Sequence, residues 1–353
     1  MKQKFLLLIL YFMSSLGFAQ ENLFYILRNN TPARMTAAQN SIESLEHHYK
    51  AIDILVPQAY QIDSNGVVWG SVDAEIIKLA SIHQLKLMPL VTNTGFNKEK
   101  THDFLLDNTA QNHAIQTLLS ICEQNHYYGL QLDFEMIGLA DKNALTKFYQ
   151  TAADALHKKG FIVSFALAPL ITDPPYSSDI QKRLYVNWEG AYDFKKLGES
   201  ADFVSVMAYN QHGGATTPGS TAHFKWVEQV IKYALAHIPA NKISLGVPAY
   251  STYWFTGTNT GDSSGKIAVN SVGISYEKAN RLAQKNLANW LWDDEAKQNM
   301  AIYQREWLNE YIFLEDARSF TAKANLAKKY NLRGISVFDL GTEDPNIWNV
   351  IVK

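Results

Sequence analysis

Short runs of apolar and β-branched residues recur along the chain, and stretches with helical spacing separate them. The runs predict eight strands, at residues 23–27, 52–57, 86–91, 128–135, 162–168, 203–209, 243–248 and 334–338. Amphipathic stretches at residues 73–83, 141–157, 223–237 and 316–330 predict helices between them. This alternation is typical of an α/β fold in which a parallel sheet closes into a (β/α)8 TIM barrel.

One connection is too long for a simple βα loop. Residues 251–313 begin with a stretch rich in Gly, Ser and Asn and continue into a longer patterned segment at 276–292. This length predicts a small insertion subdomain between the seventh strand and the last helix. We therefore assign residues 20–353 to one barrel that carries this insertion, and we expect the insertion to form one wall of a cleft.

The first nineteen residues have the pattern of a secretory signal peptide. Lys2 and Lys4 precede an apolar run at residues 5–13, and small residues follow before Ala19. The apolar run is shorter than the roughly 20 residues that a membrane helix requires. We therefore expect an extracellular or periplasmic protein without membrane insertion.

Charge and cysteine content narrow the classes of partner. The formal net charge is -2 and the isoelectric point is about 6.6, without a cluster of basic residues, so a nucleic-acid partner is not expected. Cys122 is the single cysteine, which rules out an intramolecular disulfide. No spacing typical of a metal site or phosphate loop stands out, so no cofactor or metal is expected. We also expect a monomer that acts on a neutral substrate.

The strand predicted at residues 128–135 carries the candidate chemistry. Alternation places Gln131, Asp133 and Glu135 on one face and apolar residues on the other. The two carboxylates come just before the predicted strand end, where a parallel barrel places its active site. An edge strand with a solvated polar face is the alternative interpretation of this pattern alone.

Three further segments lie at predicted strand ends, and a fourth precedes the last helix. Residues 205–212 read Ser-Val-Met-Ala-Tyr-Asn-Gln-His, residues 245–250 read Leu-Gly-Val-Pro-Ala-Tyr, and residues 334–348 follow the eighth strand. Residues 311–319 lead into the last predicted helix. Together with residues 128–135, these segments resemble glycoside hydrolase family 18, the chitinase-like barrels. They look most like the bacterial branch that includes spore-cortex and cell-wall glucosaminidases, over about residues 24–348.

This resemblance implies roles for individual residues. Glu135 matches the general acid, Asp133 matches the carboxylate that orients the 2-acetamido group of the substrate, and Tyr209 matches the tyrosine that donates a hydrogen bond to the acetamido oxygen. Asn210 stands where many members have Asp, and His212 corresponds to a His of some bacterial members. The family motif has two further acids, which Tyr128 and Gln131 replace here.

Other residues are expected to bind the sugar. Gln131 is expected on the carboxylate face, both as a buried amide of the barrel interior and as a substrate contact. Tyr60 and Asn93 follow the second and third strands, and Trp254 follows the seventh. Phe338 stands where the family usually has the tryptophan that floors the central subsite. Trp69, Trp292 and Trp348 are weaker candidates for stacking on sugar rings.

The placement of Asp133 and Glu135 on one side of a strand has a chemical consequence. They are poorly placed to attack opposite faces of one anomeric carbon, so the acetamido oxygen of the substrate is expected to act as the nucleophile. With an amide at residue 131, Asp133 is expected to ionise near an ordinary value. The expected function is retaining hydrolysis of N-acetylglucosamine glycans such as chitin, peptidoglycan or N-glycan cores. A catalytically silent carbohydrate-binding barrel, or an envelope protein that only docks on cell wall, are the alternatives.

Overall fold

A computed structural model of the chain describes residues 20–27, 32–213, 216–258 and 267–351. The residues expected to form a signal peptide, 1–19, lie outside this part. The strands of the main sheet are β1 (Glu21–Ile26), β2 (Ile54–Ile62), β3 (Val68–Gly70), β4 (Lys86–Leu87), β5 (Leu90–Asn93), β6 (Gly129–Asp133), β7 (Ile162–Leu167), β8 (Phe203–Val206), β9 (Ile243–Pro248) and β15 (Gly334–Phe338).

The main sheet closes into a barrel. The order of parallel neighbours is β1, β15, β9, β8, β7, β6, β5 and β2, and a β1–β2 pairing closes the ring. The short strands β3 and β4 pair only with β2. The eight-stranded parallel barrel predicted from the alternating pattern is therefore confirmed.

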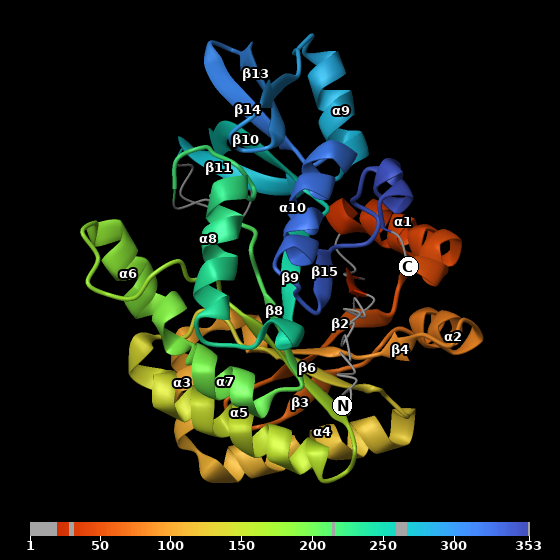
Figure 1. Ribbon diagram of the computed structural model, residues 1–353, viewed down its shortest axis with the longest axis vertical. Coiled ribbons are helices and arrows are strands. Elements are labelled where there is room, and N and C mark those ends of the chain that lie inside the picture. The colour runs from red at the N-terminus through yellow and green to blue at the C-terminus, as the bar shows by residue number, and fades with distance from the viewer. Residues whose placement is uncertain (1–19, 28–31, 214–215, 259–266, 352–353) are drawn as a thin grey trace, which may run out of the picture.

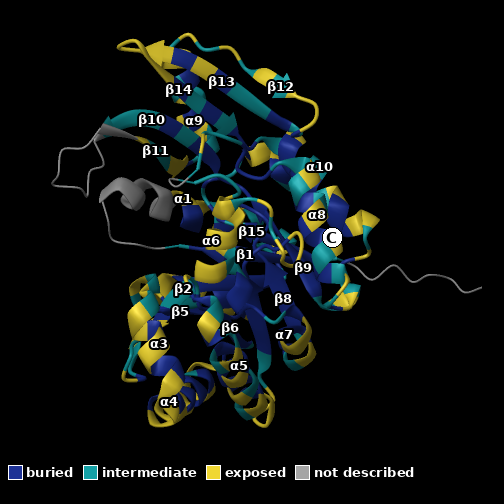
Figure 2. Ribbon diagram, turned by 90° about the vertical axis from the view of Figure 1, so that its left-hand side faces the viewer, coloured by how far each residue is buried: buried dark blue, intermediate teal, exposed yellow. Residues whose placement is uncertain are grey.

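Helices surround the barrel (Figure 1). They are α1 (Pro32–His48), α2 (Ala74–Ile82), α3 (Lys98–Leu106), α4 (Asn108–Asn125), α5 (Lys142–His157), α6 (Asp179–Asn187), α7 (Phe194–Ser200), α8 (Phe224–Leu235) and α10 (Ala317–Lys329). Aspartates cap several of them; Asp107, for example, accepts hydrogen bonds from the backbone of Thr109 and Ala110 at the start of α4. Buried positions dominate the barrel strands, whereas the surrounding helices mix buried and exposed positions (Figure 2).

Two hydrophobic layers stabilise the barrel. One small cluster, which includes Leu23, Ile54 and Phe203, fills its interior, and a larger cluster lies between the strands and the helices. The larger cluster includes Phe134 of the segment after β6 and Phe148 of α5. None of the helices in the described ranges is long and apolar enough to cross a membrane.

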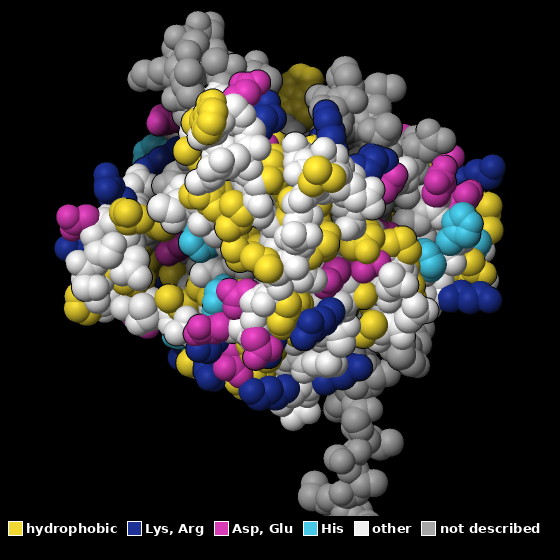
Figure 3. All heavy atoms as spheres, turned by 90° about the horizontal axis from the view of Figure 1, so that it is seen from above, with side chains coloured by type: hydrophobic (Ala, Val, Ile, Leu, Met, Phe, Trp, Pro, Cys, Tyr) yellow, Lys and Arg dark blue, Asp and Glu magenta, His cyan; other side chains and the backbone are white. Residues whose placement is uncertain are grey.

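The segment between β9 and α10 forms a second sheet. Its strands are β10 (Ser251–Thr258), β11 (Ile267–Ile274), β12 (Leu291–Asp293), β13 (Gln298–Arg305) and β14 (Leu308–Leu314), in the antiparallel order β11, β10, β14, β13, β12. Helix α9 (Tyr276–Lys285) packs on one face through Ala279 and Ala283. The sheet lies above the barrel in Figure 1. Hydrophobic side chains gather on the face seen from above in Figure 3, and Trp307, in the turn between β13 and β14, is 94% exposed.

Short helical turns complete the chain. They are η1 (Tyr49–Ala51), η2 (Thr94–Phe96), η3 (Leu139–Asp141), η4 (Glu189–Ala191), η5 (Ala240–Lys242) and η6 (Pro345–Asn349). Two of them, η3 and η4, contact each other and α6 beside the segment that follows β6.

Candidate active site

The side chains of Asp133 and Glu135 lie on the inner side of the barrel wall. Asp133 is the last residue of β6, and Glu135 follows two residues later. Phe134, between them, points outward, where its ring lies 5.9 Å from that of Phe104 and 5.5 Å from that of Phe148. Because side chains alternate along extended backbone, both carboxylates point inward at the carboxyl end of the strands. The structure thus places the two predicted carboxylates together.

Asp133 is held in a poorly solvated position. It is 6% exposed, and among the described residues its Oδ1 atom is buried without a hydrogen-bond partner. Burial, and then the charge of Glu135, raise the pKa of this carboxyl well above its usual value. The expectation that Asp133 ionises near an ordinary value was therefore wrong, because burial and Glu135 act on it even though residue 131 is an amide.

Glu135 has the protonation behaviour that a general acid requires. It is only partly accessible, and burial raises its pKa from 4.5 to about 7. The two carboxyl groups titrate as a pair, so their apparent pKa values belong to the pair. Near neutral pH such a pair retains a proton for donation.

Tyr209 stands beside these carboxylates, just beyond the end of β8. Burial, and then the charges of neighbours that include Asp133 and Glu135, raise its pKa, so its hydroxyl stays protonated and can donate a hydrogen bond. Its ring stacks on that of Phe338 at 5.5 Å, and the ring of Tyr250 meets it edge-on at 6.4 Å. Phe338 is partly accessible at the end of β15, so it offers an apolar surface at this site.

Tyr250 was not selected from the sequence. It follows β9 at the same end of the barrel, and its hydroxyl donates a hydrogen bond to Asn210 Oδ1. Asn210 is exposed and has a left-handed backbone (φ 56°), a conformation that Asn tolerates better than most residues. The signal that could have identified Tyr250 is its position directly after a predicted barrel strand.

Gln131 belongs to the barrel interior. It is fully buried, and its Oε1 accepts a hydrogen bond from Tyr25 (2.7 Å), while its Nε2 donates to Ser164 (2.8 Å) and Ser205 (3.0 Å). Ser205 in turn contacts Ser336 at 2.8 Å. Gln131 therefore has the interior role that was expected of it, in a polar layer beneath Asp133 that joins several strands, whereas the expected substrate contact is corrected because the side chain is fully buried.

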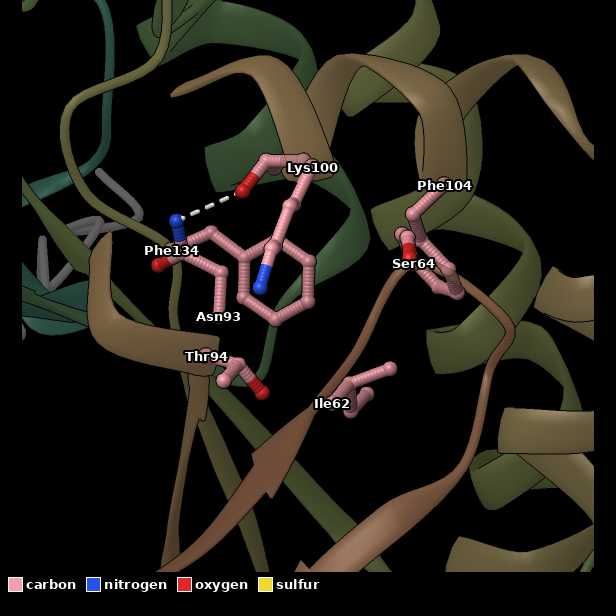
Figure 4. Close-up of a pocket in the computed structure, with 8 residues that line it drawn as sticks. Ile62, Ser64, Asn93, Thr94, Lys100, Phe104 and Phe134 are labelled. Atoms are coloured by element: carbon pink, nitrogen blue, oxygen red, sulfur yellow. Dashed lines mark hydrogen bonds between the residues drawn. The ribbon is translucent and has the colours of Figure 1, made fainter. Parts of the chain in front are cut away.

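Asn93 also differs from its prediction. It is 2% exposed, and its amide donates to the backbone oxygen of Glu135 and to Thr101 Oγ1, while its carbonyl accepts from the backbone N–H of Glu135. It lines the small pocket drawn in Figure 4, together with Phe104 and Phe134. Because its polar atoms are used within the protein, Asn93 supports the acid rather than a sugar.

Two predicted sugar contacts are buried elsewhere. Tyr60 belongs to the hydrophobic cluster between the strands and the helices, and its hydroxyl lies 3.0 Å from that of Tyr127. Trp254 of β10 is 0% exposed, so neither face of its ring is open to a substrate. Trp348 stacks on Phe24 and His48. The predictions for Tyr60 and Trp254 were therefore wrong.

The remaining candidates are at least partly accessible. His212 is partly accessible, and its Nδ1 lies 3.1 Å from the backbone oxygen of Thr217 in its own loop. Trp69 is exposed on β3, where its indole donates to Asp63. Trp292 of β12 lies under the guanidinium of Arg318 at 3.5 Å. Within the described ranges, no three His, Cys, Asp or Glu side chains are grouped so that they could hold a metal ion.

The site has the composition of a glycosidase centre. Residues 36–343 match the family model of the glycosyl hydrolases family 18. The uncharacterized glycosylase YvbX of Bacillus subtilis (strain 168) is 25% identical over 319 residues, which cover 89% of this chain and 88% of that protein. The cortical fragment-lytic enzyme of the same organism is 29% identical over 294 residues, which cover 82% of this chain and 65% of that protein.

Solved structures have the same fold. The spore cortex-lytic enzyme SleL of Bacillus megaterium QM B1551 has 25% sequence identity and a TM-score of 0.78, covering 94% of this chain and 73% of that chain. A chitinase from Chromobacterium violaceum ATCC 12472 has 23% identity and a TM-score of 0.79, and the match covers 94% of this chain and 98% of that chain. The matched family model spans most of the barrel and includes the carboxylates at the end of β6. This chain therefore belongs to glycosyl hydrolases family 18 and is a glycoside hydrolase.

Proposed function

We propose that this protein hydrolyses β-linked N-acetylglucosamine glycans with retention of configuration, using the acetamido group of the substrate as the nucleophile. One observation carries the proposal: Asp133 and Glu135 leave the same backbone segment on the same side, with Tyr209 beside them. A pair of carboxylates placed in this way cannot flank the anomeric carbon from opposite faces. The second group must therefore come from the substrate.

Each residue then has a defined task. Glu135 gives its proton to the leaving glycosidic oxygen, and the acetamido oxygen attacks the anomeric carbon to form a cyclic oxazolinium ion. Asp133, in its ionised form, holds the N–H of this ion and stabilises its positive charge, while Tyr209 orients the acetamido oxygen. Glu135, now ionised, takes a proton from the water that opens the ring. Configuration is retained because the anomeric carbon is inverted twice.

The raised pKa values bear on the protonation state of the pair before the reaction starts. Burial raises the pKa of both carboxyl groups, so the pair keeps one proton near neutral pH. One protonated and one ionised carboxyl is the state in which the reaction starts. When the positively charged ring forms, it offsets the cost of an anionic Asp133 in a buried place.

The substrate is proposed to be a chitin oligomer or the glycan strand of peptidoglycan. Similarity to a cortical fragment-lytic enzyme supports peptidoglycan, and similarity to chitotriosidase-1 of Mus musculus, 24% identical over 282 residues, supports chitin. Export by the N-terminal segment 1–19 would bring the enzyme to either polymer. Mass spectrometry of the products from chitin oligomers and from purified peptidoglycan separates the two substrates.

The experiment that tests the proposal is the variant Glu135→Gln. It removes the proton donor at nearly constant volume, so turnover of an oligosaccharide should fall by about 10² to 10⁴. Glu343→Gln is a matched control, because Glu343 is also a carboxylate whose pKa burial raises, but it bonds Ser44 and the Gly341 backbone instead. If Glu135→Gln and Glu343→Gln both turn over natural oligomers at the wild-type rate, the assignment of the acid is wrong. A carbohydrate-binding barrel without activity would show no products from the wild type.

A further inference from the structure

The backbone that carries Glu135 has left the sheet. The β5–β6 register ends at Thr92 with Asp133, and the β6–β7 register ends at Leu132 with Phe165. Phe134 and Glu135 therefore lie beyond the ladder, and their N–H and C=O groups must find other partners. Buried backbone groups without partners are costly, so those partners are informative.

Side chains take up all four of these backbone groups. The Phe134 N–H donates to Tyr149 Oη (2.9 Å), and the Phe134 carbonyl accepts from the hydroxyl of Tyr192 (2.7 Å). The Glu135 N–H donates to Asn93 Oδ1 (2.9 Å), and the Glu135 carbonyl accepts from Asn93 Nδ2 (2.9 Å). Three side chains thus fix the backbone of two successive residues.

The three side chains are themselves held firmly. Tyr149, Tyr192 and Asn93 are 0%, 2% and 2% exposed. They come from separate elements, because Tyr149 lies on α5, Tyr192 follows η4 and Asn93 ends β5. The ring of Tyr149 packs 4.5 Å from that of Phe165, and Asn93 is tied to α3 by a 2.8 Å hydrogen bond to Thr101 (Figure 4). The backbone of Phe134 and Glu135 is therefore anchored to three separate elements of the fold.

We propose that Asn93, Tyr149 and Tyr192 are positioning residues for the acid, which set the direction and depth of the Glu135 carboxyl by fixing its backbone. This proposal rests on the proposed function, in which Glu135 donates the proton. A general acid must lie within hydrogen-bond reach of the oxygen that it protonates, and an error of about 1 Å can reduce the rate about 10²-fold. Sheet pairing cannot provide this accuracy, because it ends before Glu135.

The three residues are suited to this task. Burial, and then nearby groups that include the carboxylates, raise the pKa of the Tyr149 and Tyr192 hydroxyls well above the usual value, so both stay neutral. A neutral hydroxyl can accept from the Phe134 N–H or donate to the Phe134 carbonyl, as each does here. The Asn93 amide offers one acceptor and one donor, which match the two backbone groups of Glu135.

The test compares isosteric hydroxyl deletions. Tyr149→Phe and Tyr192→Phe each remove one of these hydrogen bonds, and Tyr127→Phe is the matched control. Tyr127 is 4% exposed and, like Tyr149 and Tyr192, belongs to the large hydrophobic cluster. Its hydroxyl contacts that of Tyr60, and Tyr127 precedes β6, whereas Phe134 and Glu135 follow it. All variants are assayed on one oligosaccharide at a temperature well below their melting points.

The expected result is a fall in kcat of about tenfold for Tyr149→Phe and for Tyr192→Phe, and of about 10² for their combination or for Asn93→Ala, with KM within about twofold. The basic limb of the kcat profile should move to lower pH, because a loosened Glu135 becomes better hydrated. Tyr127→Phe should lower the melting temperature without changing kcat or the pH limb.

The proposal is overturned if Tyr149→Phe and Tyr192→Phe match Tyr127→Phe in kcat and pH limb. Glu135→Gln, measured in the same assay, separates this failure from that of the proposed function. If Glu135→Gln is inactive while the tyrosine variants behave like the control, only the positioning role is wrong. If Glu135→Gln keeps wild-type turnover, the proposed function itself is wrong.

Discussion

Two carboxyl groups, one at the end of β6 and one just beyond it, link the active site to pH. Burial is the first cause of the raised pKa of both Asp133 and Glu135, and the charge of Glu135 adds to the effect on Asp133. Such groups favour protonation in the folded state, which serves catalysis because an acid is needed. The same groups cost stability when they ionise.

The pKa of Glu135 predicts a basic limb in the activity profile. The acid must carry its proton, and its pKa is raised to about 7. We expect kcat/KM for an oligosaccharide to decline as the pH rises above about 7, and Glu343→Gln to leave this limb in place. A limb near pH 4.5, the ordinary Glu value, would show that burial does not tune the acid.

The same shift predicts that the active site costs stability at neutral pH. Below the ordinary value of 4.5, Glu135 is protonated in both folded and unfolded chains; between 4.5 and about 7 the unfolded chain loses the proton first, so stability falls as the pH rises. Glu135→Gln should therefore raise the free energy of unfolding at pH 8 by about 1 to 3 kcal/mol and change little at pH 4. Denaturant titrations at both pH values measure this.

A carboxylate with the opposite shift provides the control. Hydrogen bonds from Lys329 and Tyr330 lower the pKa of Glu228 to about 2, so its charge stabilises the folded state above the ordinary value. Glu228→Gln should lower stability at pH 8. If Glu135→Gln and Glu228→Gln changed the free energy of unfolding at pH 8 in the same direction, the pKa shifts of these two carboxyl groups would not explain how stability depends on pH.

The sequence was informative for some residues of the site and misleading for others. Alternation along residues 128–135 placed Asp133 and Glu135 correctly, because that strand is regular up to Asp133. The prediction for Tyr60 failed because it placed this residue after the end of the second strand, whereas β2 continues to Ile62 and Tyr60 lies within it. Trp254 is buried by segments that are distant in the sequence, and the local pattern of residues does not predict such packing.

Between elements, a buried ion pair joins the insertion to the barrel. Lys323 of α10 donates to both carboxylate oxygens of Glu315, at 2.8 Å each, and both side chains are 1% exposed. Gln298 of β13 and Ser319 of α10 donate to the same carboxylate. Both oxygens of the Glu315 carboxylate therefore accept hydrogen bonds, and these bonds require one relative orientation of the elements that donate them.

Removal of one partner from this ion pair should strongly destabilise the folded protein. Lys323→Met leaves the Glu315 carboxylate buried without its cation, and we expect a loss of about 3 to 5 kcal/mol in the free energy of unfolding. The double variant Lys323→Met/Glu315→Gln should recover much of this loss, because no buried charge remains. A double variant as unstable as Lys323→Met would mean that packing of the lysine chain, and not charge, matters here.

At the level of elements, the strand patterns were more reliable than the strand ends. The prediction extended one strand to residue 209 and another to residue 135, whereas β8 ends at Val206 and β6 at Asp133. Beyond β6, side chains replace sheet partners for the backbone, as Asn93 does for Glu135. Apolar alternation continues through such a segment, so the sequence cannot show where pairing stops.

In the whole molecule, closure of the barrel brings the site together. Glu135 follows β6, Tyr209 follows β8, Tyr250 follows β9 and Phe338 ends β15, so residues far apart in the sequence meet at one end. The βα alternation was sufficient to predict this ring. The order of the second sheet was not predictable, because strands as short as β12 carry little pattern and their pairing is set by tertiary contacts.

We have proposed that the acetamido group of the substrate, and not a protein carboxylate, attacks the anomeric carbon. Aryl glycosides of N-acetylglucosamine that carry zero to three fluorine atoms on the acetyl methyl group test this directly, because fluorine withdraws electrons from the attacking oxygen with little change in shape. We predict that kcat/KM falls steeply with each fluorine. Equal values of kcat/KM across the series would show that the acetamido oxygen does not act as the nucleophile.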